Sequence, residues 1–230
     1  MAPRTVDLNA DLGEEVTDDA ALLAVVTSAN VACGYHAGNA AIMRAVCADA
    51  ARLGVAVGAQ VSYDDREHFG RVARDVSYDV LRNQVADQVG TLAEIAAAAG
   101  TAVRYVKPHG ALYHRVIDDD EQAAAVLAGS ADLPVLGMPG AFLRRAVRAG
   151  RAAFREGFPD RGYTPDGRLV LRSEPGALVE EEDRIVAQAV SLAADVDSLC
   201  LHGDSPGAVD HARGVRAALE DAGVVLRAFV

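Results

Sequence analysis

The chain has 230 residues, with 22 basic and 33 acidic side chains and a formal net charge of −11. A hydrophobic content of 51% excludes an intrinsically disordered chain, and the acidic balance argues against nucleic acid, whose phosphates attract basic proteins. No apolar run approaches the roughly 20 residues of a membrane helix, residues 1–5 lack the apolar core of a signal peptide, and the three cysteines have no CxxC spacing. We therefore expect a folded cytoplasmic protein with no nucleic-acid partner and no membrane.

Short apolar segments alternate with Ala-rich segments at helical spacing. In chain order, the expected strands are Val6–Asn9, Ala29–Cys33, Val55–Ala59, Val103–Val106, Pro134–Gly137, Ala152–Phe154, Leu169–Leu171 and Ser198–Leu201, with Val224–Ala228 as a further candidate. The expected helices are Asp19–Val26, Asn39–Arg52, Tyr78–Ala99, Asp119–Ala128, Gly140–Arg148, Glu180–Ala193 and Pro206–Ala222. Strand and helix in alternation are typical of a parallel sheet with helical crossovers.

The domain organisation follows from this alternation, because the chain contains no linker, long charge block or internal repeat. We predict an α/β fold with a single domain over residues 1–230. Its architecture is a (β/α) barrel of seven or eight mostly parallel strands, with an open doubly wound sheet as the alternative.

Local chemistry supports several helix boundaries. Asp118 and Glu121 have capping-box spacing, Ser205-Pro206 suits a helix start, and three glycines follow helix ends: Gly54, Gly100 and Gly223.

Two loops are longer than β/α connections require, and we expect them to be lids over a site. One runs from Gln60 to Ser77 and contains Arg71, and the other runs from Arg155 to Arg168 and contains Arg161.

Polar residues gather where strands end, which is where active sites lie in parallel β/α folds. In the first strand Asp7, Asn9 and Asp11 share one face, because side chains alternate along a strand. A barrel strand has no solvent face, so these groups should point into the barrel. There, buried carboxylates need partners.

Three histidines and the chain's one lysine also follow strands, next to glycines: His36, Lys107, His109 and His202. Histidines beside carboxylates can transfer protons near neutral pH, and a lysine can polarise a carbonyl or hold a phosphate. Asp204 and Ser205 open a helix, whose free N–H groups can bind an anion. This convergence indicates an enzyme. His68, His114 and His211 are expected to be peripheral, and Cys33 to be a small buried residue.

Common nucleotide and hydrolase motifs are absent from the sequence. There is no phosphate-binding GxxxxGK[ST] loop, no strand–GxGxxG–helix fingerprint and no GxSxG elbow. Asp11, His36 and His109 form a conceivable oxygen and nitrogen ligand set for a metal, although their spacing matches no metal motif.

At these same positions the chain resembles the LamB/YcsF family, which comprises the A-subunits of 5-oxoprolinase. The resemblance lies in DLNADLGEE (7–15), TSANVACGYHAGN (27–39), RYVKPHGALY (104–113) and CLHGDSPGAV (200–209). Weaker matches keep the same order: HFGR (68–71), FPDRGY (158–163) and LVLRSEPGAL (169–178). One position departs from the family pattern. Where the family usually has His-Pro, this chain has Gln60-Val61, and glutamine is neither a base nor a strong metal ligand.

The resemblance implies a barrel of the glycoside hydrolase/deacetylase type. It also implies ATP-dependent opening of the lactam of 5-oxoproline to glutamate, together with subunits B and C, with ATP and Mg²⁺ as co-substrate. We expect Lys107 and the helix start at Asp204 to handle the oxyanion or phosphate, and Asp11, His36, His109 and His202 to handle protons and water. The expected substrate-binding residues are Asn9, Glu14, Gln60, Arg71 and Arg161.

Two alternative functions predict different experimental results. A metal-dependent deacetylase or amidohydrolase would contain stoichiometric metal and work without ATP. A non-catalytic substrate-binding subunit would tolerate replacement of His109 or His202 with little loss of rate.

Overall fold

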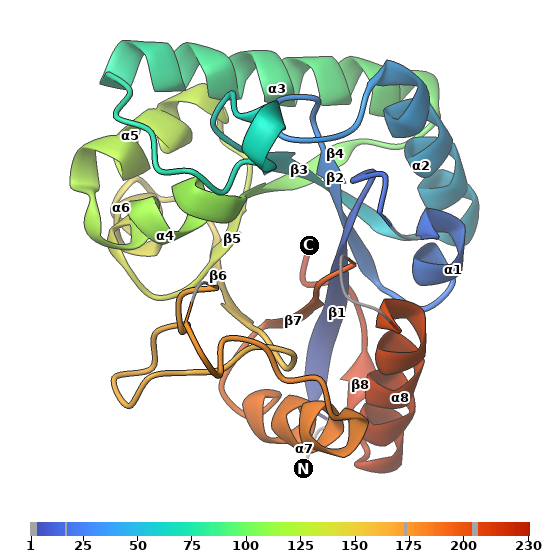
Figure 1. Cartoon of the computed structure of the whole chain (residues 1–230). Coiled ribbons are helices and arrows are strands. Elements are labelled where there is room, and N and C mark those ends of the chain that lie inside the picture. The colour runs from blue at the N-terminus through green and yellow to red at the C-terminus, as the bar shows by residue number, and fades with distance from the viewer. Residues whose placement is uncertain (1–3, 17, 173, 204–206) are drawn as a thin grey trace.

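Seven parallel strands close into a ring in the computed structural model, which describes residues 4–16, 18–172, 174–203 and 207–230 (Figure 1). The ring runs β1-β2-β3-β4-β5-β6-β7 and returns to β1, and β8 pairs in parallel with the start of β1. This arrangement confirms the predicted α/β barrel. The strands are β1 Thr5–Leu12, β2 Ser28–Ala32, β3 Ala56–Val61, β4 Val103–Pro108, β5 Val135–Gly137, β6 Ala153–Gly157, β7 Ser198–Leu201 and β8 Val225–Leu226.

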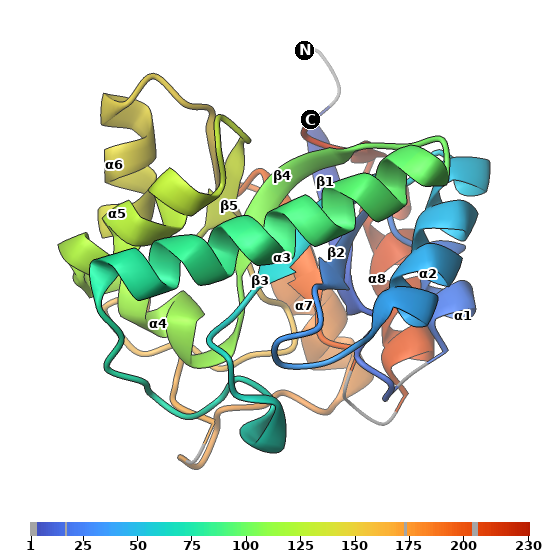
Figure 2. The same cartoon turned by 90° about the horizontal axis from the view of Figure 1, so that it is seen from above.

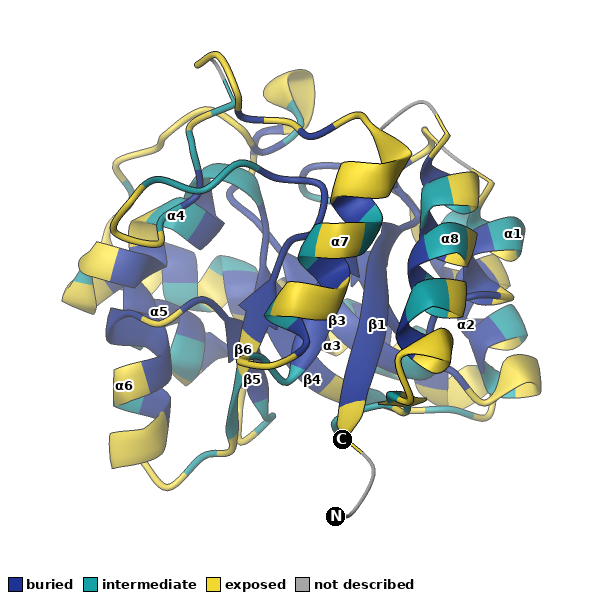
Figure 3. Ribbon diagram, turned by 90° about the horizontal axis from the view of Figure 1, so that it is seen from below, coloured by how far each residue is buried: buried dark blue, intermediate teal, exposed yellow. Residues whose placement is uncertain are grey.

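Helices surround the ring, and the long helix α3 lies across one side of it (Figure 2). Their outer faces are exposed, whereas the strands they cover are buried (Figure 3). Among the described residues, no helix is both long enough and apolar enough to span a membrane. The helices are α1 Asp19–Leu23, α2 Ala40–Leu53, α3 Tyr78–Ala98, α4 Gly110–Asp118, α5 Asp120–Gly129, α6 Ala141–Arg148, α7 Glu182–Leu192 and α8 Ala208–Asp221, with a 3-10 turn η1 at Arg66–His68.

The alternation along β1 separates an apolar outer face from a polar inner face, as predicted. Asp7 is completely buried and accepts hydrogen bonds from three hydroxyl groups: Thr27 Oγ1 at 2.5 Å, Ser28 Oγ at 2.6 Å, and Ser198 Oγ. Burial raises the pKa of Asp7 to about 6, although these hydrogen bonds oppose the rise. The interior of the barrel is therefore a hydrogen-bonded polar core.

The C-terminal segment closes the end of the barrel where the strands begin, and the C-terminus lies inside the ring in Figure 1. Phe229 packs on Tyr105 and Phe154, with ring centroids 4.9 and 4.7 Å apart. The ring of Tyr105 lies against Gly58, where a Cβ atom would come within 2.2 Å of it. The Tyr105 hydroxyl donates to Asn30 Oδ1 at 2.6 Å. This hydrogen bond connects the aromatic residues at the closed end to the polar core of the barrel.

Three local predictions were wrong. Residues 169–171 form no strand, because Arg161 donates to the carbonyl oxygens of Val170 and Ala177 and so holds this segment as an irregular loop with one isolated bridge at Leu169. Helix α4 was missed, because it starts immediately after β4 without a connecting loop. The N-cap of α5 is Asp119 rather than Asp118, since the Asp119 carboxylate accepts from the N–H groups of residues 121 and 122.

Other boundary predictions were confirmed. Gly54, Gly100 and Gly223 all have positive φ after helix ends, and the further candidate strand near the C-terminus is present as β8. The predicted helix start at Ser205-Pro206 lies outside the described residues.

Candidate active site

A cavity of about 360 Å³ opens at the carboxyl ends of the strands. Its size suits a small metabolite. Seven of the residues selected from the sequence line it: Asp11, Glu14, Arg71, Lys107, His109, Arg161 and His202. Predicted site residues from β1, β4 and the segments after β3, β6 and β7 thus meet in one pocket.

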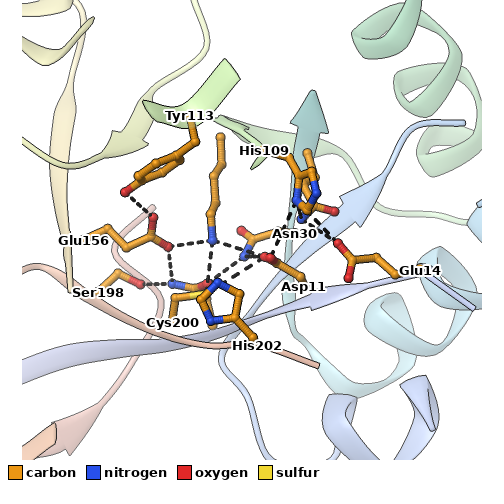
Figure 4. Close-up of polar contacts among 12 residues, drawn as sticks. Asp11, Glu14, Asn30, His109, Tyr113, Glu156, Ser198, Cys200 and His202 are labelled. Carbon is orange, nitrogen blue, oxygen red and sulfur yellow. Dashed lines mark hydrogen bonds and ion pairs between the residues drawn. The ribbon is translucent and has the colours of Figure 1, made fainter. Parts of the chain in front are cut away.

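Lys107 lines this pocket, and its ammonium group lies between the carboxylates of Asp11 and Glu156, which are both labelled in Figure 4. Its Nζ is 3.1 Å from Asp11 Oδ1 and 2.8 Å from Glu156 Oε1, and it also donates to Cys200 Sγ at 3.1 Å. Burial alone would lower the pKa of Lys107, but Asp11 and the other negative neighbours hold it well above its ordinary value. Lys107 is thus a fixed positive charge at the base of the cavity.

Asp11 and Glu156 are themselves oriented by neighbours. Asn30 Nδ2 donates to Asp11 Oδ1 at 2.9 Å, and Tyr113 OH donates to Glu156 Oε2 at 2.9 Å. Burial would raise the pKa of Asp11, but Lys107 beside it keeps that pKa below its ordinary value. Every charged group in this part of the site is thus held by partners on other strands.

A second polar group lies beside the first, where Glu14, His36, Gln60 and His109 meet and Asp11 Oδ2 is 4.0 Å from His109 Nδ1. Gln60 Nε2 is 2.9 Å from Glu14 Oε1 and 2.8 Å from His109 Nδ1, and His109 Nε2 is 3.1 Å from the Phe69 carbonyl oxygen. These contacts assign a neutral His109 whose Nδ1 accepts and whose Nε2–H donates. Burial, followed by the adjacent His36, lowers the pKa of His109 well below its ordinary value.

A third group pairs His202 with Asp160. His202 Nδ1 lies 2.9 Å from Asp160 Oδ2, and the same carboxylate oxygen accepts from the His202 backbone N–H at 2.8 Å. The carboxylate thereby fixes the orientation and tautomer of the His202 ring, and His202 lines the pocket. Burial would raise the pKa of Asp160, but His202 keeps it low, so the carboxylate stays charged.

The loop after β3 reaches this site through two glycines. Gly110 has φ +60°, and a Cβ atom there would come within 2.3 Å of the Gly70 carbonyl oxygen, which accepts from Ala111 N–H at 2.8 Å. Gly70 itself packs beside Ser62, where a Cβ atom would come within 2.4 Å of the hydroxyl. Arg71 follows at the rim of the pocket, with its guanidinium over the Phe69 ring. The predicted lid therefore covers part of the site, and its movement stays a prediction.

Not every predicted residue faces the pocket. Asn9 lies below it and donates to Glu156 Oε1 and Ser198 Oγ, while His36 and Gln60 lie behind the lining residues. Arg161 reaches the lining, although its guanidinium also binds the loop carbonyls described above. Asp204 lies outside the described residues. Cys33 is buried as expected, and burial raises the pKa of its thiol.

Sequence reasoning missed four contributors to the site. Glu156 lies just beyond the predicted end of its strand, and Tyr113 lies on the missed helix α4. Asp160 lies in the loop from Arg155 to Arg168, and nothing in the sequence assigned it a role. His114 was expected to be peripheral, but it lines the pocket. A strand prediction extended by two residues would have placed the Glu156 side chain in the barrel.

Comparisons with known proteins agree with this geometry. The model of the LamB/YcsF family matches residues 6–230. A 5-oxoprolinase A-subunit of Streptomyces griseus is 53% identical over 248 residues, covering 97% of this chain and 99% of the relative, and one of Mycobacterium avium is 49% identical with 97% and 98% covered. The crystal structure of a lactam utilization protein from Thermus thermophilus has a TM-score of 0.91 and 35% identity, covering 98% of this chain and all of that one.

More distant structures share the fold alone. A family 4 carbohydrate esterase from Streptomyces lividans has a TM-score of 0.56 at 12% identity, over 98% of this chain and 93% of the esterase. The barrel therefore shares its overall fold with that esterase. With the family model matching nearly the whole chain, the protein belongs to the LamB/YcsF family.

Proposed function

We propose that this chain is the component of a 5-oxoprolinase that opens the lactam of 5-oxoproline to give glutamate, coupled to ATP hydrolysis and in complex with subunits B and C. The observation that carries the proposal is Lys107, held as a buried cation between Asp11 and Glu156 at the floor of a small pocket. Relatives of about half identity that are named as A-subunits of 5-oxoprolinase support the substrate. Because the reaction consumes ATP, we propose that it takes place in the cytoplasm.

A lactam is a resonance-stabilised amide, so opening it benefits from activation. Transfer of the γ-phosphoryl group of ATP to the lactam oxygen gives ADP and an imidate-like phosphate. Addition of one water to the ring carbon and cleavage of its bond to nitrogen give an acyl phosphate, which a second water hydrolyses to glutamate and phosphate. Because the sequence has no phosphate-binding loop, we propose that ATP binds on a partner protein or at an unusual site, with Mg²⁺ accompanying it as co-substrate.

The first and third polar groups, together with Arg71, can divide this work. Lys107 would stabilise the charge that develops on the oxygen under attack, because a preorganised cation is effective in a site that excludes water. His202, oriented by Asp160, would take a proton from the attacking water and return it to the departing ring nitrogen. Arg71 at the rim suits the carboxylate of the substrate, which bidentate guanidinium groups bind well. Proton transfer by His36 and His109 stays a prediction.

The test is glutamate release from 5-oxoproline and ATP, with the chain alone, with subunits B and C alone, and with all three. We expect glutamate only in the complete mixture, together with one ADP per glutamate. Absence of glutamate from a folded, assembled complex would overturn the proposal. Release without ATP would favour the metal-dependent amidohydrolase alternative.

A further inference from the structure

Behind the pocket wall, Glu14, His36, Gln60 and His109 form a compact group whose polar atoms converge, which we name the β1–β4 cluster. The rings of His36 and His109 are stacked, with centroids 4.0 Å apart and planes 14° apart. Glu14 Oε1 lies near the same edge of both rings, 3.6 Å from His36 Nε2 and 3.5 Å from His109 Nδ1. One potential ligand atom from each of these three residues lies within 4.8 Å of the others.

The cluster contains buried polar atoms that lack hydrogen-bond partners. Only 1% of His36 is exposed, yet within the described part of the chain neither of its ring nitrogens forms a hydrogen bond. Gln60 Oε1 is also buried without a partner there. Buried polar groups are nearly always satisfied, so the unpartnered His36 Nε2, which faces Glu14 Oε1, indicates a missing ligand.

The Gln60 amide explains how the cluster holds together without that ligand. Its Nε2 lies between Glu14 Oε1 and His109 Nδ1, where its two hydrogens reach both acceptors. Rotation of the amide by half a turn would place Oε1 there instead. Three acceptor atoms would then face one another, an arrangement that is stable only around a cation.

We propose that the β1–β4 cluster binds one divalent transition-metal ion through Glu14, His36 and His109, with the Gln60 amide turning its oxygen to the ion as a weaker fourth ligand. Metal–ligand bonds of 2.0–2.1 Å in a tetrahedral site place neighbouring ligand atoms about 3.3 Å apart. The separations of Glu14 Oε1 from the two ring nitrogens are close to this spacing, so small side-chain shifts complete the site. Imidazole and carboxylate ligands together suit Zn²⁺, Co²⁺ or Mn²⁺.

This ligand set differs from the one considered in the sequence analysis, which contained Asp11 in place of Glu14. Asp11 Oδ1 is already engaged by Lys107 and Asn30, and its Oδ2 is 4.0 Å from His109 Nδ1. Glu14 has no lysine or arginine partner among the contacts that the structure gives it. The inference does not depend on the proposed reaction, because it concerns occupancy of the cluster.

The experiment measures metal binding by the full-length chain. After removal of metals with a chelator, Co²⁺ is titrated and followed by its visible absorption, and Zn²⁺ retained after gel filtration is measured by mass spectrometry. We expect one ion per chain in the natural sequence. His36→Ala should weaken binding by at least about 100-fold, and Gln60→His should strengthen it by about tenfold or more, since imidazole is the better ligand.

His211→Ala is the matched control, because His211 lies on α8 outside the cluster, and it should bind as the natural chain does. The proposal is overturned if the folded natural chain binds no ion, including the case in which only Gln60→His binds one. It is equally overturned if His36→Ala, folded by circular dichroism, still binds with unchanged affinity. A metal-loaded chain that releases no glutamate in the complete mixture would contradict the proposed reaction alone.

Discussion

Lys107 and Glu156 connect β4 to β6 through the interior of the barrel, with 2.8 Å between Nζ and Oε1. Asp11 of β1 lies on the other side of the same ammonium group at 3.1 Å. Three strands of the ring are thereby joined by one buried cation. The chain's one lysine is thus both the proposed electrostatic catalyst and a structural link.

Lys107→Met should reduce glutamate release by the complete mixture at least about 100-fold, because the oxyanion loses its preorganised cation. The substitution also leaves two buried carboxylates without their partner. Removing one partner of a buried ion pair typically costs about 3–5 kcal/mol of unfolding free energy. Urea unfolding and the glutamate assay measure the two effects separately.

A double variant separates catalysis from stability. Lys107→Met with Glu156→Gln removes one of the unpaired charges and should recover part of the unfolding free energy without recovering turnover. Arg184→Met, at an exposed surface arginine, is the control and should change neither quantity. Near-normal turnover in Lys107→Met would remove Lys107 from the proposed mechanism.

Asp160→Asn should reduce kcat about 100-fold with little change in KM, because the amide no longer holds His202 in the productive tautomer. Steady-state kinetics of the assembled enzyme measure this split. Asp166→Asn, an exposed carboxylate near the other end of the same loop, should keep normal kinetics. Equal losses in both variants would indicate a general disturbance of the loop rather than a role for the His202–Asp160 pair.

Strand-end residues were predictable from the sequence because the fold class determines where they meet. Asp11, Lys107, His109 and His202 all follow or end strands, and parallel strands of a barrel bring these ends to one face. Tyr113 was not predicted, because it lies on the missed helix that follows β4. Glu156 was missed because the predicted strand stopped at Phe154.

The hydrogen-bond partners could not be read from the sequence at all. Which acceptor the Gln60 amide reaches depends on strand register and on Gly70 approaching the site, and neither has a local signature. The false strand at 169–171 has the same origin. Its apolar pattern resembles a strand, but the side chain of Arg161, nine residues before Val170, binds the Val170 carbonyl oxygen.

Gly58→Ala should destabilise the closed end of the barrel. A Cβ atom at this position would lie 2.2–2.3 Å from the ring of Tyr105, which is itself held by Phe229 and by its bond to Asn30. Overpacking of this kind costs about 1–3 kcal/mol. Gly90→Ala on the exposed side of α3 meets no atom within 4 Å and should instead stabilise the chain by about 0.5–1 kcal/mol. Thermal unfolding of both variants gives the comparison, and destabilisation of similar size in both would contradict the packing argument.

Asp7 should make the stability of the chain fall as the pH rises from about 4 to 6. Its pKa is about 6 in the folded protein against 3.8 ordinarily, because burial favours the neutral form. Between these values the folded chain keeps a proton that the unfolded chain has lost, so the unfolding free energy decreases with pH. A difference of about two pKa units corresponds to about 3 kcal/mol.

Asp7→Asn removes this contribution, so the unfolding free energy of the variant minus that of the natural chain should rise by about 2 kcal/mol from pH 4 to pH 6.5. Urea unfolding across this range measures the difference. Asp166→Asn provides a control of opposite sign, because a hydrogen bond from Thr164 lowers the pKa of that exposed carboxyl. Parallel curves for Asp7→Asn and the natural chain would mean that the hydroxyl groups around Asp7 compensate fully for its burial, and that the polar core of the barrel holds a charge without cost.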